Sequence, residues 1–296
     1  MEKKFESLSI FEFHKLFPDD DACYLYLENL KLAHGYQCIK CKNTKYHAGQ
    51  GKLGRKCSLC NHQESVTCNT LFHKVKFSIL MAFYIIYYMS TSKKGISSTE
   101  LSRKLQLRQK TCWLFKRKVM EAMASSGKHP LIGDVEIDET LVGGKEKKVI
   151  GREHGKKKLV VFAIEKFGNG VKRAYGKVIQ NAGTKELEPF VKAVVHPDSQ
   201  ITTDKWRGYL PLKKEFKKLK QKKSKQGKNF DPLHRYIMGF KGWLRGIHHS
   251  VDHLQAYINE YNYRYNRHFM KGDIFENLMV RMVDHKPAFY KMLKVS

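Results

Sequence analysis

The stretch GDVEIDETLVGGKEKK, residues 133–148, places four acids around a short apolar alternation in a chain otherwise crowded with lysine. Val135 and Ile137 fall on one face of an extended strand, whereas Asp138 and its polar neighbours fall on the other. Strict alternation over this length predicts a half-buried β-strand. The strand therefore places acidic side chains at the edge of a core, which indicates that they have a chemical role.

Further strand-like segments follow at 159–166, 171–179 and 199–204, with a helical segment at about 185–195 before the last of them. Three strands in hairpin succession, then a helix, a strand and a helix, predict an α/β domain with a mixed sheet. The ribonuclease H-like fold fits this order best, so we expect a catalytic domain in which a mixed sheet is flanked by helices.

In that fold the first strand is central and the fourth lies beside it, which makes Asp138 and Asp204 neighbours. Two facing carboxylates repel and raise each other's pKa, so such a pair usually holds a metal ion or shares protons. Oxygen ligands suit Mg²⁺, and two such ions can assist phosphoryl transfer. The alternative interpretation is that Asp138 caps a turn and Asp204 caps a helix that begins in KWRGY.

The charge balance predicts a polyanionic partner. The 296 residues include 56 Lys+Arg against 28 Asp+Glu, a formal charge of +28, while 42% hydrophobic residues exclude wholesale disorder. Lysine clusters at 145–158 and 213–228 flank the candidate acids and would neutralise DNA phosphates, although lysine runs are often merely solvated. The expected DNA contacts in the second cluster are Lys217, Lys218, Lys220, Lys222 and Lys223.

No targeting segment is visible in the N-terminal MEKKFESLSI, and the longest apolar run, Phe77 to Met89, has 13 residues. A membrane-spanning helix needs roughly 20. We therefore expect a cytoplasmic, DNA-associated protein that does not enter a membrane.

Four of the seven cysteines form two Cys-x2-Cys pairs separated by 15 residues. This spacing is typical of a zinc ribbon, here at about 36–66, in which four thiolates close one structural tetrahedral zinc site. The alternative is a set of four reduced, buried thiols. The expected ligands are Cys38, Cys41, Cys57 and Cys60.

A helix-turn-helix is predicted after the ribbon. An apolar helix at about 75–90 precedes a short polar helix at Ser98–Leu105 and a basic helix at Arg108–Met123. The last helix could enter a DNA groove, or its charges could form an ordinary solvated face. The expected DNA contacts are Arg108, Lys110, Lys116 and Arg117, with Lys118 beside them.

Three stretches, VEIDETLVGGKEKK, TTDKWRGY and HRYIMGFKGWLRGIHHSVDHLQAYINEYNYRYNR, resemble the DDE-type insertion-sequence transposases of the ISXO-like group, which is related to Merlin elements. The resemblance covers essentially the whole chain, zinc ribbon included. It implies cleavage of element ends with water, joining of the freed 3′-hydroxyl to target DNA, and a homo-oligomer on double-stranded DNA. Carried over by position, the catalytic residues are Asp138, Asp204, His234 and Lys241.

The resemblance assigns Asp138, Asp204 and His234 to two Mg²⁺ or Mn²⁺ ions. Seven residues are about two helical turns, so His234 and Lys241 share one helix face. An isolated histidine in an apolar helix is, without context, more often a structural residue. Asp231 competes for the third ligand position, but with Pro232 after it we expect Asp231 to be the helix N-cap.

Glu136 and Glu139 are acids near the site that lie outside the carried-over set. The expected domains are an N-terminal segment with the ribbon at 1–70, a helix-turn-helix domain at 71–127, the catalytic domain at 128–270 and a C-terminal tail at 271–296. Two other functions stay open: a ribonuclease H-like nuclease without strand transfer, and a catalytically inactive zinc-ribbon DNA-binding regulator.

Overall fold

A computed structural model describes residues 8–295 except 34, 52–53, 145–154, 226–227, 249–251, 269 and 271–272. The chain divides into two compact units, one comprising Met1–Met123 with Met270–Val295 and the other Ala124–Phe269. Within the described residues, no helix combines the length and the hydropathy needed to cross a bilayer.

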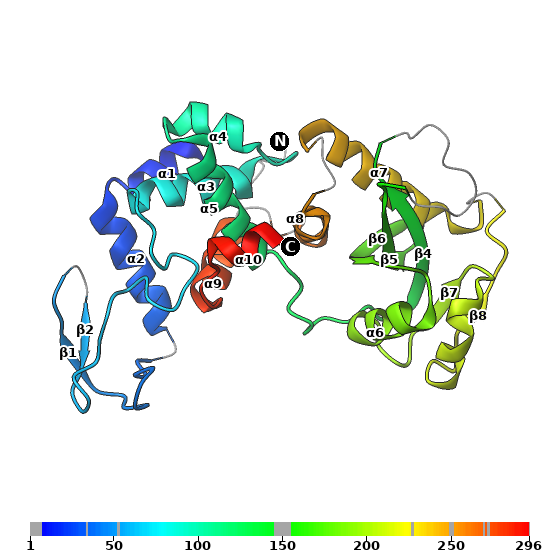
Figure 1. The fold of residues 1–296 in the computed structure, drawn as a ribbon, viewed down its shortest axis with the longest axis horizontal. Coiled ribbons are helices and arrows are strands. Elements are labelled where there is room, and N and C mark those ends of the chain that lie inside the picture. The colour runs from blue at the N-terminus through cyan, green and yellow to red at the C-terminus, as the bar shows by residue number, and fades with distance from the viewer. Residues whose placement is uncertain are drawn as a thin grey trace, which may run out of the picture. The chain divides into compact units, whose positions relative to one another are not determined.

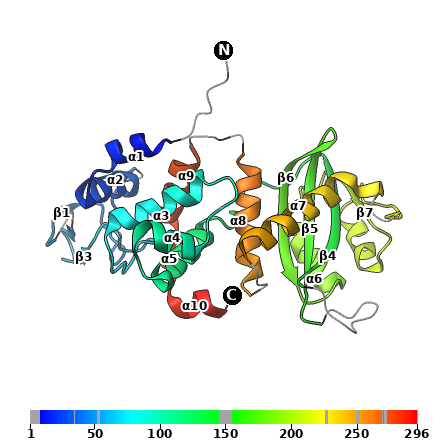
Figure 2. The same ribbon diagram turned by 90° about the horizontal axis from the view of Figure 1, so that it is seen from above.

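The first unit contains a small antiparallel ribbon of β1 (Tyr46–Ala48), β2 (Arg55–Cys57) and β3 (Gln63–Glu64), visible at one end of this unit in Figures 1 and 2. Ion pairs connect the ribbon to helix α2 (Asp20–Leu32): Arg55 Nε lies 3.6 Å from Glu28, and Glu64 lies 3.9 Å from Lys31. These contacts attach the ribbon to the helical part of the unit.

The helices of the first unit surround the strongly apolar α3 (Ile79–Thr91), in which Phe83, Ile85 and Ile86 are buried. The other helices are α1 (Ile10–Leu16), α4 (Ser98–Leu105), α5 (Gln109–Ala122), α9 (Ile274–Asp284) and α10 (Tyr290–Val295).

Helices α4 and α5 lie where the sequence predicts the helix-turn-helix. They are joined by residues 106–108, beginning with Gln106 in the left-handed conformation. Residues 271–296, expected as a tail, contain α9 and α10. Helix α9 packs against α2, α3 and α5, because its apolar face needs a partner.

The second unit is built on one five-stranded sheet with the order β6-β5-β4-β7-β8 (Figure 1). Strands β4 (Asp134–Val142), β5 (Lys158–Phe167) and β6 (Gly170–Ile179) are antiparallel neighbours. Strands β7 (Gln200–Thr203) and β8 (Lys220–Gln221) continue the sheet in parallel with β4.

Helices cover both faces of this sheet. One core packs under α6 (Thr184–Val194) and the 3₁₀ segment η1 (Arg207–Lys214), and includes Val135, Ile137 and the fully buried Tyr209. The other packs under α7 (Asp231–Ile247), which follows the 3₁₀ turn η2 (Lys228–Phe230), and α8 (Leu254–Asn266). The predicted ribonuclease H-like fold class is confirmed, with β4 at the centre and β7 beside it.

Candidate active site

The end of β7 brings Asp138 and Asp204 together. Parallel pairing between β4 and β7 stops where Ile137 meets Thr203, and each aspartate is the next residue in its strand direction. Pairing with β5 continues past this point, so β4 stays hydrogen-bonded on one side while its other side has no paired strand. Ligand atoms of Asp138, Asp204 and Glu139 all lie within 4.8 Å of one another.

Asp204 stands on a turn fixed by hydrogen bonds. Its Oδ1 accepts from the backbone N–H of Trp206 at 3.0 Å, so it holds a turn and leaves Oδ2 for a cation. The amide Nε2 of Gln221 donates to the carbonyl oxygens of Asp204 at 3.0 Å and of Trp206 at 2.9 Å. Gln221 therefore positions Asp204 from the edge strand β8.

Asp138 faces α7. Its Oδ1 accepts from the backbone N–H of Glu139 at 2.9 Å, and its Oδ2 lies 3.5 Å from Nε2 of His234. Burial raises the pKa of Asp138, and the neighbouring Asp204 raises it further, although the Glu139 amide and His234 oppose the shift.

Glu139 is the residue that sequence reasoning left outside the site. Its Oε1 accepts a short hydrogen bond from the hydroxyl of Tyr209. Burial, followed by the charges of Asp138 and Asp204, raises the pKa of Glu139 from 4.5 to about 7, against the opposing effect of the Tyr209 hydrogen bond. In the sequence, the position of Glu139 directly after Asp138 is the feature that could have indicated it. Whether its side chain reaches the site depends on where β7 ends, which the sequence pattern does not show.

The three carboxylates fit a divalent cation. Raised pKa values at Asp138 and Glu139 mean that the protein itself does not neutralise the charge gathered there. Hard oxygen donors at this separation suit Mg²⁺ or Mn²⁺ better than softer metals. Asp138 and Asp204 are the predicted residues that would hold such an ion, and Glu139 places a third carboxylate within 4.8 Å of them.

Helix α7 brings His234 and Lys241 to the same face of the sheet as Asp138. The side chain of His234 is 41% exposed, yet its Nε2 is shielded from solvent and makes no hydrogen bond to a described residue. Lys241 Nζ donates to Oγ1 of Thr140 at 2.7 Å. Burial and then Lys157 lower the pKa of Lys241, and no ion pair joins its ammonium to an acid among the described residues.

The expected N-cap role of Asp231 is wrong. Helix α7 begins at Asp231 itself, because η2 runs directly into it, and Phe230 occupies the cap position without a side-chain bond. The carboxylate of Asp231 instead pairs with Arg235 at 3.1 Å, four residues on and exposed. Asp231 thus points away from a capping role and is a surface ion-pair residue.

The four predicted cysteines come together in the first unit with zinc-ribbon geometry. Cys38 Sγ lies 3.6 Å from Cys60 Sγ, and Cys41 Sγ lies 3.5 Å from Cys57 Sγ. Thiolates around a tetrahedral zinc ion, at about 2.3 Å each, are about 3.8 Å apart. Backbone hydrogen bonds, the strongest from Cys60, lower the pKa of Cys57 to about 6, which favours the thiolate that a metal binds.

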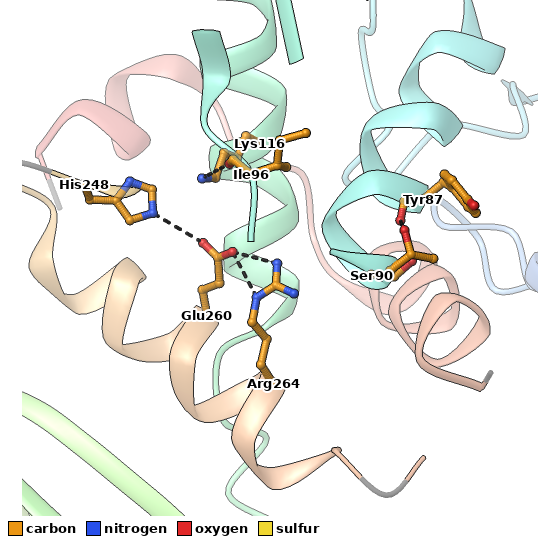
Figure 3. A network of polar contacts seen from close by, with 8 residues as sticks. Tyr87, Ser90, Ile96, Lys116, His248, Glu260 and Arg264 are labelled. Carbon is orange, nitrogen blue, oxygen red and sulfur yellow. Dashed lines mark hydrogen bonds and ion pairs between the residues drawn. The ribbon is translucent and has the colours of Figure 1, made fainter. Parts of the chain in front are cut away.

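Two of the predicted DNA contacts on α5 are buried, which corrects their assignment. Lys116 Nζ donates to the carbonyl of Ile96 at 2.6 Å (Figure 3), and Arg117 lies 3.5 Å from the carbonyl of Leu293. Lys118 next to them donates to Leu71 and His73. Long aliphatic stems allow these cations to reach buried carbonyls, so they stabilise the unit instead of facing DNA.

The other predicted DNA contacts are exposed. Arg108 and Lys110 lie at the start of α5, and the second cluster lines the segment after η1 and the edge strand β8. Its exposed members are Lys217, Lys218, Lys220, Lys222 and Lys223. Most of the 145–158 cluster, residues 145–154, falls outside the described residues.

A buried polar group within the second unit supports α8. Glu260 is fully buried and accepts from Arg264 at 2.8 Å, and His248 lies 4.0 Å from its other oxygen (Figure 3). His248 immediately follows α7, so this group connects the end of the helix that carries His234 to α8.

Comparison with known proteins places a family over the second unit. Residues 130–266 match the ISXO2-like transposase domain, a range that contains every residue of the candidate active site. A search of curated proteins finds no match to the chain.

Proposed function

We propose, from the premise that residues 130–266 belong to the ISXO2-like transposase domain family, that this DNA transposase cuts element ends and joins the freed 3′-hydroxyl to target DNA. The observation that carries the proposal is the convergence of Asp138, Glu139 and Asp204 at the end of β7, with His234 and Lys241 on the adjoining helix. This arrangement suits phosphoryl transfer, in which positioning and charge neutralisation supply most of the catalysis.

The carboxylates of the site would bind the divalent ions and fix their positions. Two divalent ions bound here would activate the attacking hydroxyl and neutralise the leaving oxygen. Asp138 is anchored by the rigid β4, and Asp204 by its turn and Gln221, so neither carboxylate needs to reorganise when DNA arrives. His234 would complete the ligand set through Nε2.

Lys241 supplies a positive charge beside the carboxylates. Its Nζ keeps only a neutral partner, the hydroxyl of Thr140, among the described residues. A neutral partner leaves the ammonium charge available for a DNA phosphate, and Thr140 fixes its direction. We assign Lys241 to phosphate positioning.

Two exposed basic regions would guide DNA. Arg108 and Lys110 at the start of α5 suit the element end, and the lysines of 217–223 lie on the segment that leads from η1 to α7. Surface lysines bind phosphates without sequence preference, so this second region supports affinity more than selectivity. The ribbon, with one zinc ion, would add a further contact module.

The test uses the DNA that flanks the gene, since inverted repeats on both sides would identify the element ends. The full-length protein, Mg²⁺ and a labelled fragment of one end should yield a nick at the end, and a pre-cut end should become joined to plasmid DNA. Cleavage without joining would favour the nuclease alternative. Binding without cleavage in Mg²⁺ or Mn²⁺ would favour the inactive regulator, and both outcomes contradict the proposal.

A further inference from the structure

Adjacent residues on a continuous strand point to opposite faces of the sheet, which normally keeps their carboxylates apart. Asp138 lies on the face covered by α7, and Glu139 on the face that contains Tyr209. Their ligand atoms nevertheless lie within 4.8 Å of each other and of Asp204. This convergence is achieved only because β7 has ended, so both side chains reach around the open edge of β4.

Tyr209 fixes the position of Glu139. The tyrosine belongs to η1 and is fully buried in the core that this segment covers, and its hydroxyl donates to Oε1 of Glu139. Asp204 lies five residues before Tyr209, on the turn that leads into η1, so neighbouring parts of the chain supply one carboxylate and the residue that orients another. A ligating carboxylate commonly accepts such a bond through one oxygen and binds the metal through the other.

We propose that Glu139 is a ligand of the divalent cation bound by Asp138 and Asp204, and that Tyr209 is its positioning residue. The inference rests on the proposed function, since it needs the metal site. It makes the ligand set of the ISXO2-like domain in this chain richer in carboxylate than Asp138, Asp204 and His234 alone. A harder ligand set favours retention of Mg²⁺.

The competing explanation is structural: Glu139 could serve only as the acceptor that a buried tyrosine hydroxyl needs. Glu139→Gln separates the two roles. The amide oxygen still accepts from Tyr209, but the negative charge is lost. Tyr209→Phe makes the opposite change, because it removes the hydrogen bond and keeps the carboxylate.

The experiment uses the full-length protein without DNA, with zinc bound and with no other divalent metal. Mn²⁺ is titrated into it, and free Mn²⁺ is followed by electron paramagnetic resonance. We expect Glu139→Gln to weaken Mn²⁺ binding at least about tenfold and Tyr209→Phe to weaken it by less. The thermal midpoint of metal-free Glu139→Gln should be no lower than that of the wild type, since the tyrosine bond survives. Unchanged Mn²⁺ affinity in Glu139→Gln would overturn the proposal.

Asp204→Asn, measured in parallel, separates failure of this inference from failure of the proposed function. If Asp204→Asn weakens Mn²⁺ binding and Glu139→Gln does not, Glu139 is only the acceptor for Tyr209. If neither variant changes Mn²⁺ binding, the acidic cluster holds no catalytic metal and both proposals fall. Glu188→Gln, which changes an exposed acid on α6 paired with Lys192, is the matched control and should bind Mn²⁺ as the wild type does.

Discussion

Nε2 of His234 lies 3.5 Å from Oδ2 of Asp138, although the two residues are far apart in the sequence. This separation is longer than a strong hydrogen bond, and it suits two groups that share a cation between them. Asp231, one turn earlier, is directed to Arg235 instead.

His234→Ala should abolish end cleavage while the protein stays folded, because the site loses a ligand without losing a core contact. Asp231→Ala should keep full cleavage and lose only about 0.3–0.5 kcal/mol of unfolding free energy, the value of an exposed i,i+4 pair. End-cleavage rates and urea unfolding measure the two effects. An active His234→Ala protein beside a folded, inactive Asp231→Ala protein would move the ligand to Asp231.

Asp138→Asn and Asp204→Asn should each abolish cleavage and joining and leave DNA binding within about twofold, because each removes a carboxylate that holds metal. Electrophoretic mobility shift and end-cleavage assays on the same preparations test this. Near-normal cleavage by either variant would contradict the assignment of the metal site.

The four-cysteine site should hold one zinc ion whose binding free energy also stabilises the ribbon. Removal of zinc by a chelator should therefore unfold residues near 36–66, with amide hydrogen exchange as the readout. Cys57→Ser should reproduce this loss in the presence of zinc, whereas Cys68→Ser, at a cysteine outside the cluster, should not. Purified protein without stoichiometric zinc would refute the prediction.

The metal-free protein should lose stability as pH rises from about 4.5 to about 7. Folding raises the pKa of Glu139 from 4.5 to about 7, so the folded state binds more protons than the unfolded chain across this window. The loss should be about 3–4 kcal/mol at most, the free energy that corresponds to a rise in pKa from 4.5 to about 7. Urea unfolding at a series of pH values measures it. Glu139→Gln should flatten the dependence, and an equal slope in that variant would assign the effect to other groups.

DNA affinity should fall steeply with salt, and changing Lys217, Lys218, Lys220, Lys222 and Lys223 to Gln should flatten that dependence. Lys116→Met, which removes a buried cation, should leave the salt dependence unchanged and lower the unfolding free energy by about 1–3 kcal/mol. Binding isotherms of both variants at several salt concentrations measure these salt dependences. An unchanged slope in the five-lysine variant would exclude this cluster from the DNA path.

The sequence predicts much of this architecture because local patterns determine it. The alternation around Val135 and Ile137 indicates β4, and its central position beside β7 follows from the element order of the fold. The two Cys-x2-Cys pairs indicate the ribbon directly, since each knuckle is a local turn. The match of residues 130–266 confirms the family resemblance over that range.

The remainder depends on tertiary structure. In the sequence, Lys116 and Arg117 look like part of a solvated basic helix face. Only the packing of α5 shows that both side chains are buried and donate to backbone carbonyl oxygens. Strand alternation places Glu139 on the opposite face of the sheet from Asp138. That its carboxylate still lies beside Asp138 can be predicted only when the end of β7 is known. The role of Asp231 as a helix cap depends on whether the residues before it are already helical, and the cap preferences of single residues do not decide this.

The hydrogen bonds from Gln221 have a mechanical consequence for the turn that carries Asp204. Along the edge strand, Lys220 and Lys222 are exposed, whereas Gln221 between them turns inward to hold the carbonyls of Asp204 and Trp206. The backbone N–H of Lys222 also donates to Thr203, directly before Asp204. Under the proposed function, DNA bound by Lys220 and Lys222 would pull on the same strand that holds Asp204 in place, through the Gln221 side chain and the Lys222 backbone.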